Sequence, residues 1–329
     1  MDWFERLTGF AEQSPEQVRA NLTLAEGRIC SKVNQGCWDA GRLTLPSLQE
    51  LRALPLQLSG RLQVQELVAD VQQLHADPTN AGALFQVASQ FNLLEMVSPS
   101  VSPEQGVGGY QHDRTQGPAC AIAAGAATIY RNYFVELDGQ IGQSSEQQID
   151  CLAELGAALG NKDKRLWQMQ NGYVIASRAG LTEIATYLKN ASAKEKEQLK
   201  GKLRIGVHAH AQVTLDQCEH KVTQVLCSAL PIAYSQYESG LWREFAQLVL
   251  QAAYEATLAA AVQNAQESGN NTVYLTLLGG GAFGNPEEWI IDAIRQALLA
   301  YQDAGLNVLI VSYLRSKPSV KALVDELKQ

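Results

Sequence analysis

The chain has 329 residues, of which 46% are apolar and 18% charged, and its formal net charge is −8. This apolar share excludes a disordered chain and allows a sizeable core, while the acidic balance argues against a protein that binds duplex nucleic acid through its phosphates. No membrane partner is expected either, because the most apolar stretches, 119–127 and 308–314, are shorter than the roughly 20 residues that span a bilayer, and the charged N-terminus lacks a signal segment.

The first 79 residues are predicted to form a small α+β extension. A polar helix is expected at 14–22, with Ser14 as its N-cap and a proline next to it. Asn34 and Gly36 indicate a turn-rich hairpin. A short helix should then open at Ser47.

Short β-rich runs alternate with helices from residue 80 to 329, which we expect to form the second domain. Strands are predicted at 82–89, 130–137, 173–177, 203–215, 222–230, 273–278 and 307–313, and helices at 118–128 and 242–267. Runs of Val, Leu and Ile between helices indicate a sheet covered on both faces. The fold class predicted is therefore α/β, a three-layer α/β/α sandwich with a mixed, largely parallel sheet.

A glycine-rich loop follows the predicted strand at 273–278. Its candidate ligand-binding residues are Gly279, Gly280, Gly281, Ala282, Phe283 and Gly284. Glycines let the backbone approach a ligand closely and turn its N–H groups toward an anion. A helix should begin next, with Asn285 as N-cap, Pro286 at its first position and Glu288 at its third.

The two glutamates of that first helical turn, Glu287 and Glu288, oppose a phosphate at the same place. Carboxylates near a helix N-terminus compete with an anion for its partial positive charge. The loop amides would therefore have to hold most of the ligand. The alternative is a tight strand-to-helix turn that binds nothing.

Three segments together resemble a known family. GGGAFGN (279–285), with the following helix and the strand NVLIVSY (307–313), is similar to the second phosphate-binding loop and last βα unit of macrodomains, especially their poly(ADP-ribose) glycohydrolase-like branch. VASQFN (87–92) is similar to the strand end where macrodomains place an Asn on the distal ribose. TQGPACAIAAGAA (115–127) is similar to the helix after their first loop.

This resemblance implies that residues 80–329 form a macrodomain-like domain whose partner is ADP-ribose or an ADP-ribosylated substrate. The diphosphate would lie on Gly279–Gly284 and the distal ribose near Asn92. It further implies hydrolysis of an ADP-ribosyl linkage, with no cofactor and no metal. A non-catalytic module that only binds ADP-ribose is the alternative.

The chain departs from the family pattern where the catalytic residues would be. A 22-residue insertion separates Asn92 from the helix near 118, and its glycine cluster is limited to Gly106, Gly108 and Gly109. The adjacent glutamate pair of the glycohydrolases is absent. Glu95 and Asp113 are therefore the candidate catalytic carboxylates, since a partly desolvated carboxyl suits general acid or base work at a glycosidic bond.

The remaining candidates of this site are polar or aromatic. Asn92 could offer its amide to ribose hydroxyls, Phe283 could pack on a sugar, and Tyr110 could cover the cleft. Gln90 is a further candidate ligand-binding residue.

Two rival chemistries use other residues. Cys120, near a helix N-terminus with His112 eight residues earlier, could form a nucleophile–base pair. Four potential zinc ligands recur at alternating spacing, namely His208, His210, Cys218 and His220. The six cysteines are unevenly spaced and without a CxxC pair, so we predict reduced thiols and a cytoplasmic location.

Overall fold

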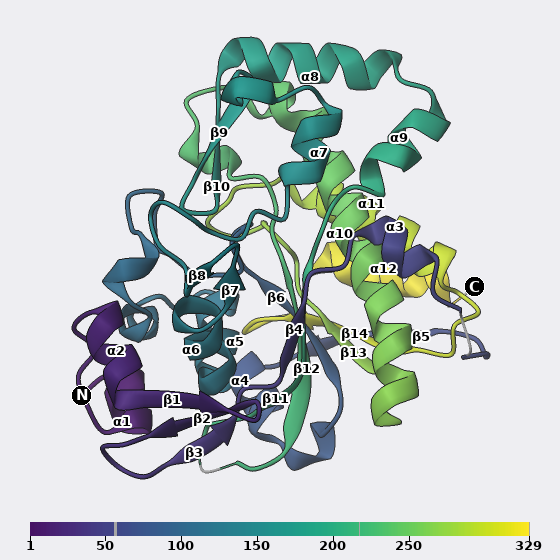
Figure 1. Cartoon of the computed structure of the whole chain (residues 1–329). Helices are drawn as coiled ribbons and strands as arrows, with labels where there is room; N and C mark the ends of the chain where they lie inside the picture. Colours follow the sequence, from purple (N-terminus) through teal and green to yellow (C-terminus); the bar gives the residue numbers. More distant parts are fainter. Residues whose placement is uncertain (56–57, 217, 329) are drawn as a thin grey trace.

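The fold is built around one central β-sheet with helices packed against it (Figure 1). The computed structural model describes residues 1–55, 58–216 and 218–328. Within these ranges the sheet has seven strands, in the spatial order β4 (Arg42–Thr44), β11 (Gly206–Gln212), β12 (Lys221–Cys227), β6 (Leu84–Ala88), β13 (Thr272–Leu275), β14 (Asn307–Ser312) and β5 (Gln63–Val68). The strands predicted at 82–89, 203–215, 222–230, 273–278 and 307–313 are thus confirmed.

Strand direction divides the sheet into two parts. From β12 through β6, β13 and β14 to β5, every neighbouring pair is parallel, whereas β11 runs antiparallel to both β12 and β4. The carboxyl ends of five strands therefore meet at one edge, which is where open α/β sheets place their ligands. The predicted mixed, largely parallel sheet is confirmed.

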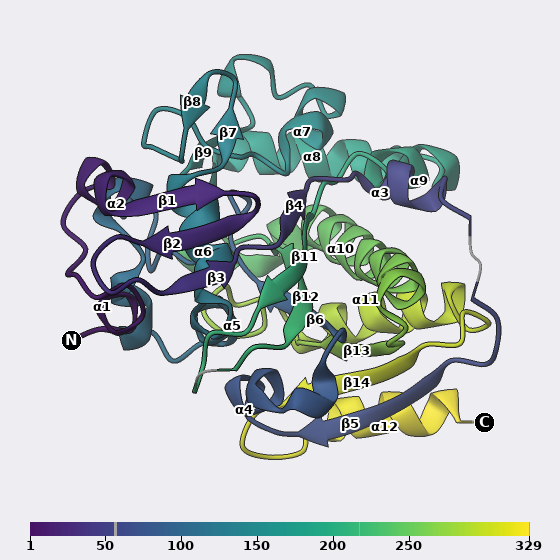
Figure 2. The ribbon, with the colours of Figure 1, turned by 60° about the horizontal axis from the view of Figure 1, so that its bottom comes forward.

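Helices cover both faces of the sheet, as the views in Figures 1 and 2 agree. One face carries α10 (Ser239–Ser268), α11 (Glu287–Ala300) and α12 (Pro318–Leu327), with α3 (Leu48–Arg52), α8 (Arg178–Asn190) and α9 (Ala193–Lys200) packed against α10. The other face carries α4 (Val71–Ala76), α5 (Gln116–Ala123) and α6 (Gly125–Tyr133). The α/β/α sandwich is confirmed.

Side-chain alternation explains why both faces are buried. In β13, Val273 and Leu275 enter the large core beneath α10 and α11, while Tyr274 points to the opposite core. Successive side chains of a strand point to opposite faces, so a strand that is apolar at every position needs cover on both sides.

Helix α10 is the longest apolar element. By length and composition it could cross a membrane, but 83% of its most apolar window is buried inside the fold. It ends at Gly269, whose φ of +77° is the left-handed conformation typical of a glycine C-cap. Here it serves as the core helix against which α8 and α11 pack.

The N-terminal segment contains the predicted helix and hairpin. Helix α2 (Pro15–Asn21) has Ser14 as N-cap, and β1 (Leu22–Ala25), β2 (Arg28–Ser31) and β3 (Cys37–Asp39) form an antiparallel sheet beside α1 (Trp3–Thr8). The capped helix after Ser47 is α3. However, β4 and β5 of this segment are edge strands of the central sheet, so the expected division at residue 79 runs through that sheet.

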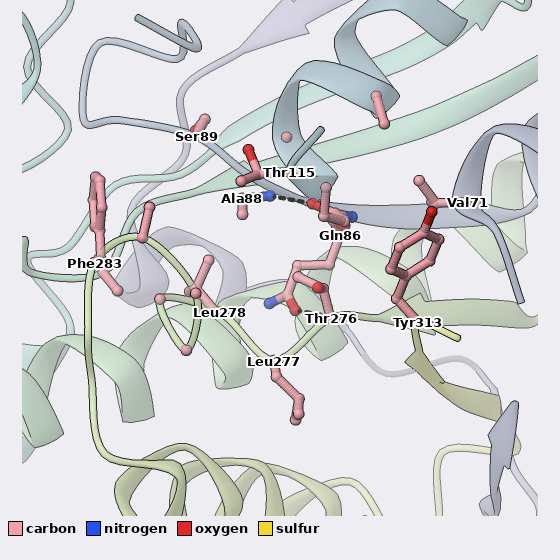
Figure 3. Close-up of a pocket in the computed structure, with 18 of the residues that line it drawn as sticks. Val71, Gln86, Ala88, Ser89, Thr115, Thr276, Leu277, Leu278, Phe283 and Tyr313 are labelled. Atoms are coloured by element: carbon pink, nitrogen blue, oxygen red, sulfur yellow. Dashed lines mark hydrogen bonds between the residues drawn. The ribbon is translucent and has the colours of Figure 1, made fainter. Parts of the chain in front are cut away.

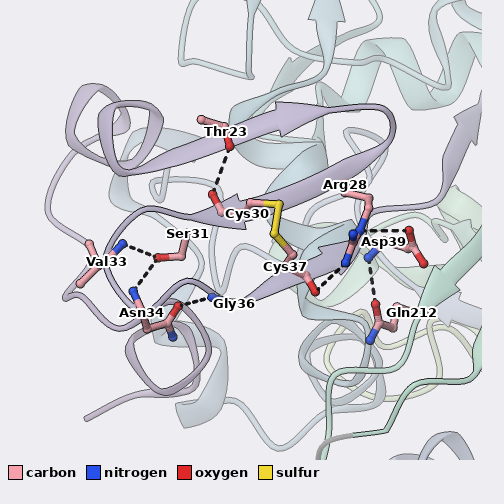
Figure 4. The surroundings of a disulfide bond; sticks show 10 residues. All are labelled: Thr23, Arg28, Cys30, Ser31, Val33, Asn34, Gly36, Cys37, Asp39 and Gln212. Carbon is pink, nitrogen blue, oxygen red and sulfur yellow. Dashed lines mark hydrogen bonds and ion pairs between the residues drawn. A yellow bond between two sulfur atoms is a disulfide. The ribbon is translucent and has the colours of Figure 1, made fainter.

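The prediction of six reduced cysteines is wrong for one pair. Cys30 and Cys37 face each other in the β2–β3 register and are joined by a disulfide (Figure 4). The hairpin that was predicted from its turn residues brings the two Cα atoms to 4.1 Å, within bonding reach. Spacing along the chain alone did not indicate this pairing. Cys120, Cys151 and Cys227 are buried free thiols, and Cys218 is half-buried.

The predicted strand at 130–137 is also wrong. Residues up to Tyr133 belong to α6, and only β7 (Glu136–Leu137) follows, paired with β8 (Gln140–Ile141). Packing of Ile129 and Tyr133 against the N-terminal core outweighs the β propensity of the aromatic residues. The helix predicted at 118–128 is two helices, α5 and α6, which meet at Ala124.

The remaining elements lie outside the central sheet. They are α7 (Ala153–Ala158), the hairpin of β9 (Trp167–Gln170) and β10 (Tyr173–Ala176), and short 3-10 turns at Pro78–Asn80, Pro103–Gln105, Gly108–His112, Lys162–Lys164 and Ile232–Tyr234. The strand predicted at 173–177 is therefore confirmed, but as part of this separate hairpin.

Candidate functional site

A cavity of about 460 Å³ lies at the carboxyl edge of the parallel strands (Figure 3). Segments that end or follow all five parallel strands line it: 69–71 after β5, 88–90 at the end of β6, Ala229 after β12, 276–283 after β13, and 312–313 at the end of β14. This size and position are typical of small-molecule sites in α/β proteins.

The cavity exists because β6 and β13 separate. Their pairing is limited to Val273 with Leu84 and Tyr274 with Phe85. Beyond that point the side-chain amide of Gln116 takes the place of a neighbouring strand, since it donates to Gln86 O at 2.8 Å and accepts from Ala88 N at 2.9 Å. The dashed line at Ala88 in Figure 3 marks the second of these hydrogen bonds.

The glycine loop forms one wall, as predicted. Gly279, Gly280, Gly281, Ala282 and Phe283 line the cavity, whereas Gly284 does not. Gly284, at φ +70°, instead lies against Ala233, and its N–H donates to Gly281 O at 3.0 Å.

Most of the loop's N–H groups are available to a ligand. Gly280 N donates to Leu277 O at 3.1 Å. Within the described ranges, the amides of Gly279, Gly281, Ala282 and Phe283 have no acceptor within hydrogen-bond distance. Backbone N–H groups are strong donors, and several converging on one space form an anion-binding concavity.

The helix after the loop starts one residue later than predicted. Pro286, not Asn285, is the N-cap of α11. Asn285 is buried, and its amide donates to Leu230 O at 2.9 Å and to Gly279 O at 3.3 Å. Asn285 therefore fixes the loop to the end of the neighbouring strand segment instead of capping the helix, and Glu287 becomes the first helical residue.

Glu95 lies at the β6 end of the cavity. It is 3% exposed, and its Oε1 atom has no hydrogen-bond partner in the described part of the chain. Burial raises the pKa of Glu95 well above its usual range; the Arg131 charge opposes this and the Asp113 charge adds to it. A carboxyl group whose pKa is raised holds its proton to higher pH and is better suited to donate it as a general acid.

Arg131 lies near the Glu95 carboxyl group and hydrogen-bonds to the chain just before it. Its guanidinium is fully buried and donates from Nε to Leu93 O at 3.0 Å and from Nη2 to Thr128 Oγ1 at 3.0 Å. Burial lowers the pKa of Arg131 to about 10, so the group remains a cation at neutral pH. It thereby fixes the turn that leads into Glu95.

Two further predicted residues line the cavity. Asp113 is half-buried, and its Oδ1 accepts from Thr115 N at 2.8 Å. Gln90 is buried, and its Oε1 accepts from Met96 N at 2.7 Å. Phe283 lies near Tyr173 and Tyr234, with ring centroids 5.4 and 5.7 Å away. These side chains and Glu95 share one end of the cavity.

Asn92 and Tyr110 lie elsewhere. Asn92 is fully buried outside the cavity lining; its Nδ2 donates to Gln148 at 2.8 Å and its Oδ1 accepts from Leu94 N at 3.1 Å. The side chain thus stabilises a turn. Tyr110 packs in the N-terminal core, where its hydroxyl accepts from Glu95 N at 2.9 Å. Tyr110 therefore fixes the backbone of Glu95 and does not line the cavity.

Several lining residues were not identified from the sequence. Asp70 and Val71 follow β5, Tyr313 and Lys317 follow β14, and Arg114 precedes α5. The signal that could have found the first four is their position at the end of a strand. Asp70 and Val71 were missed because β5 was not recognised as a strand, whereas Tyr313 and Lys317 were missed although the strand at 307–313 was predicted.

The thiol alternative does not fit the structure. Cys120 is fully buried and does not line the cavity. Burial raises the pKa of its thiol well above the usual range, and the Glu95 charge adds to this. His112 is exposed. A nucleophilic thiolate is disfavoured in such surroundings.

The four potential zinc ligands are not brought together. His208 is buried beside Arg131, with Nδ1 3.2 Å from Nη1, while an irregularity between His208 and Ala211 leaves His210 exposed. His220 contacts His75 O at 2.8 Å and Cys218 contacts Ala76 O. In the described ranges no three His, Cys, Asp or Glu side chains are arranged to hold a metal ion.

No protein-family model matches the sequence, and no curated protein matches it. Among solved structures, the poly(ADP-ribose) glycohydrolase of Thermomonospora curvata is similar at 15% identity and a TM-score of 0.47, over 95% of each chain. That of Deinococcus radiodurans in complex with ADP-ribose is similar at 12% identity and a TM-score of 0.45, over 87% of this chain and 94% of the other.

Proposed function

We propose that the cavity binds ADP-ribose or an ADP-ribosyl group and that the protein hydrolyses the bond at the anomeric carbon of the distal ribose. The observation that carries this proposal is the pairing, in one cavity, of four unpartnered loop amides with a buried carboxyl group. The amides suit a diphosphate, and the carboxyl suits proton transfer at a glycosidic bond.

Sheet order supports one orientation of the ligand. The glycine loop follows β13, which lies between β6 on one side and β14 and β5 on the other. Figure 3 shows the same order, with Phe283 and Ser89 at one end and Val71 and Tyr313 at the other. A diphosphate on the loop would therefore place one sugar near Glu95 and the adenosine near Tyr313.

The adenosine end offers suitable surfaces. Tyr313 is 60% exposed and could stack on a base. Asp70 caps α4 through Oδ1, which accepts from Gln72 N at 2.8 Å. Its Oδ2 has no hydrogen-bond partner within the described residues, and this atom could accept from an exocyclic amine.

The proposed reaction uses Glu95 first as an acid. Its proton passes to the leaving-group oxygen as the bond from that oxygen to the anomeric carbon breaks. A water molecule then forms the new bond to that carbon, and its proton returns to the Glu95 carboxylate. Asp113 could orient this water, and Gln90 takes the ribose contact that was predicted for Asn92.

Titration calorimetry with ADP-ribose and a single-turnover assay on a small ADP-ribosyl ester test the proposal together. We expect saturable binding of ADP-ribose and release of the label by the wild type. Asp113→Asn should slow release more than it weakens binding.

The outcomes separate the candidate functions. Binding without turnover would leave a non-catalytic module, which is the alternative reading. Absence of ADP-ribose binding would contradict the proposal. Alkylation of thiols should leave turnover unchanged, since Cys120 is buried; loss of turnover would revive the thiol mechanism.

A further inference from the structure

An ion pair stands beside the glycine loop. Glu287 is the first residue of α11, and Lys317 immediately precedes α12. Lys317 Nζ lies 2.9 Å from Glu287 Oε2, and the Ser319 hydroxyl donates to the same carboxylate. Both charged side chains line the cavity together with the loop.

The pair resolves the conflict noted in the sequence. A carboxylate at a helix N-terminus repels a phosphate bound next to it. Here Glu287 carries a neutralising partner, and the Ser319 and Lys317 contacts lower the pKa of Glu287, so it stays ionised at neutral pH. The two charges cancel, and the loop can receive an anion without facing a net negative charge from this pair.

The pair is also able to exchange partners. The side chains of Lys317 and Glu287 are 41% and 45% exposed, and ion pairs this accessible to solvent contribute little net stability. The backbone of Lys317 is fixed independently, because its N–H donates to Glu66 Oε1 at 2.7 Å. The ammonium group can therefore turn on its flexible stem while its attachment point stays in place.

Lys317 and Arg114 lie on different walls of the cavity. Among described residues, Arg114 and Lys317 are the basic residues of the cavity. Arg114 precedes α5, on the wall that also carries Asp113 and is close to Glu95. Lys317 joins α12 to the β14 end of the cavity and contacts the first residue of α11, the helix that follows the glycine loop.

We propose that Lys317 is a phosphate ligand of this site and that it exchanges Glu287 for the diphosphate when ligand binds. This inference rests on the proposed function. It makes Glu287 an antagonist of binding, because the exchange leaves an unpaired carboxylate near the phosphates. The site then favours ligands with two phosphate charges over uncharged nucleosides.

Calorimetry on four variants tests the exchange, with ADP-ribose, ADP and adenosine as the probes. Lys317→Met should weaken ADP-ribose and ADP binding by about three- to tenfold, as expected for loss of one charge-assisted hydrogen bond. Glu287→Gln should strengthen both by a similar factor. Adenosine should bind all variants equally, and Lys317→Arg should retain most of the affinity.

Lys321→Met is the matched control, because Lys321 is an exposed lysine one turn further along α12 that does not line the cavity. Its affinities should equal those of the wild type. Raising the salt from about 50 to 300 mM should weaken ADP-ribose binding less in Lys317→Met than in the wild type.

Two results would overturn the inference, and they are distinguishable from failure of the proposed function. Equal ADP-ribose affinity in Lys317→Met and Lys321→Met would refute the exchange while leaving ADP-ribose binding intact. Weaker binding in Glu287→Gln would assign the pair a structural role. If the wild type binds neither ADP-ribose nor ADP, the proposed function falls and the exchange falls with it.

Discussion

The buried imidazole of His75 makes the stability of the protein depend on pH. His75 is fully buried in α4, where its Nδ1 lies 2.7 Å from Val71 O and its Nε2 lies 3.2 Å from Gln224 Nε2. A carbonyl and an amide NH₂ group at these positions favour the neutral ring with its proton on Nδ1. Burial lowers the pKa of His75 to about 4.

The size of the effect follows from this value. The unfolded chain binds a proton near pH 6.5 and the folded protein near 4, so His75 contributes its full stability above pH 6.5 and loses it as the pH falls toward 4. At about 1.36 kcal/mol per pKa unit, the loss is about 2 kcal/mol at pH 5 and about 3 kcal/mol when complete. Protonation of His75 Nε2 would also place its N–H group against the side-chain NH₂ group of Gln224, so that two donors would face each other.

This loss would reach the cavity. The His75 ring stacks on Phe85 at a centroid distance of 3.8 Å, and Phe85 stacks on Tyr274 at 4.5 Å. Phe85 and Tyr274 both line the cavity. The neutral imidazole therefore supports the cavity wall near the proposed adenosine end.

Urea unfolding between pH 7 and 4.5 measures the effect on the wild type and on His75→Gln, which does not titrate. The wild type should lose about 2 kcal/mol more than the variant over this range. Subtracting one curve from the other removes the contribution of the carboxyl groups, which is common to both proteins. Among these, Glu95 has a raised pKa, so its contribution to stability increases as the pH falls, opposite to that of His75. Parallel curves would refute the assignment of a neutral, buried His75.

Three further predictions concern the site and the N-terminal hairpin. Glu95→Gln should reduce turnover by about 10²–10⁴-fold while ADP-ribose affinity stays within about threefold, as single-turnover kinetics and calorimetry would show; unchanged turnover would exclude Glu95 as the acid. Gly279→Ala should destabilise the fold by about 1–3 kcal/mol, because φ is +73° and the new Cβ would lie 2.4 Å from Ala229 Cβ, whereas Gly281→Ala, with open space around it, should stay within about 0.5 kcal/mol; equal unfolding midpoints would contradict the loop geometry. Reduction of Cys30–Cys37 should lower the free energy of unfolding by about 2–3 kcal/mol, since the bond closes a short loop, and a thermal midpoint insensitive to reductant would count against it.

Local patterns in the sequence were sufficient for much of the fold. The glycine loop could be predicted because a buried strand, a run of glycines and a helix signal follow one another directly. The helix after Ser14 and the end of α10 at Gly269 are likewise determined by residues that are adjacent in the sequence. Glu95, which was selected as a candidate carboxylate, lies beyond the end of β6 and lines the cavity.

Features that depend on distant parts of the chain could not be predicted in this way. Asn92 was expected at the ligand, but Gln148 and Leu94 occupy its amide. The Gln116 side chain bonds to β6 beyond the point where β13 separates from it, and no local pattern indicates that a side chain replaces a strand there. Lys317 reaches the site because α12 packs on α11.

The proposed function depends on binding of a diphosphate by the loop amides. The most direct test is a titration of ADP-ribose followed by backbone amide NMR, with attention to Gly281, Ala282 and Phe283. We expect these three resonances to shift in a saturable manner, at ADP-ribose concentrations that leave the amides of the β1–β2 sheet unchanged. If these resonances do not shift while calorimetry still detects binding, the ligand binds elsewhere, and the loop amides do not bind the diphosphate.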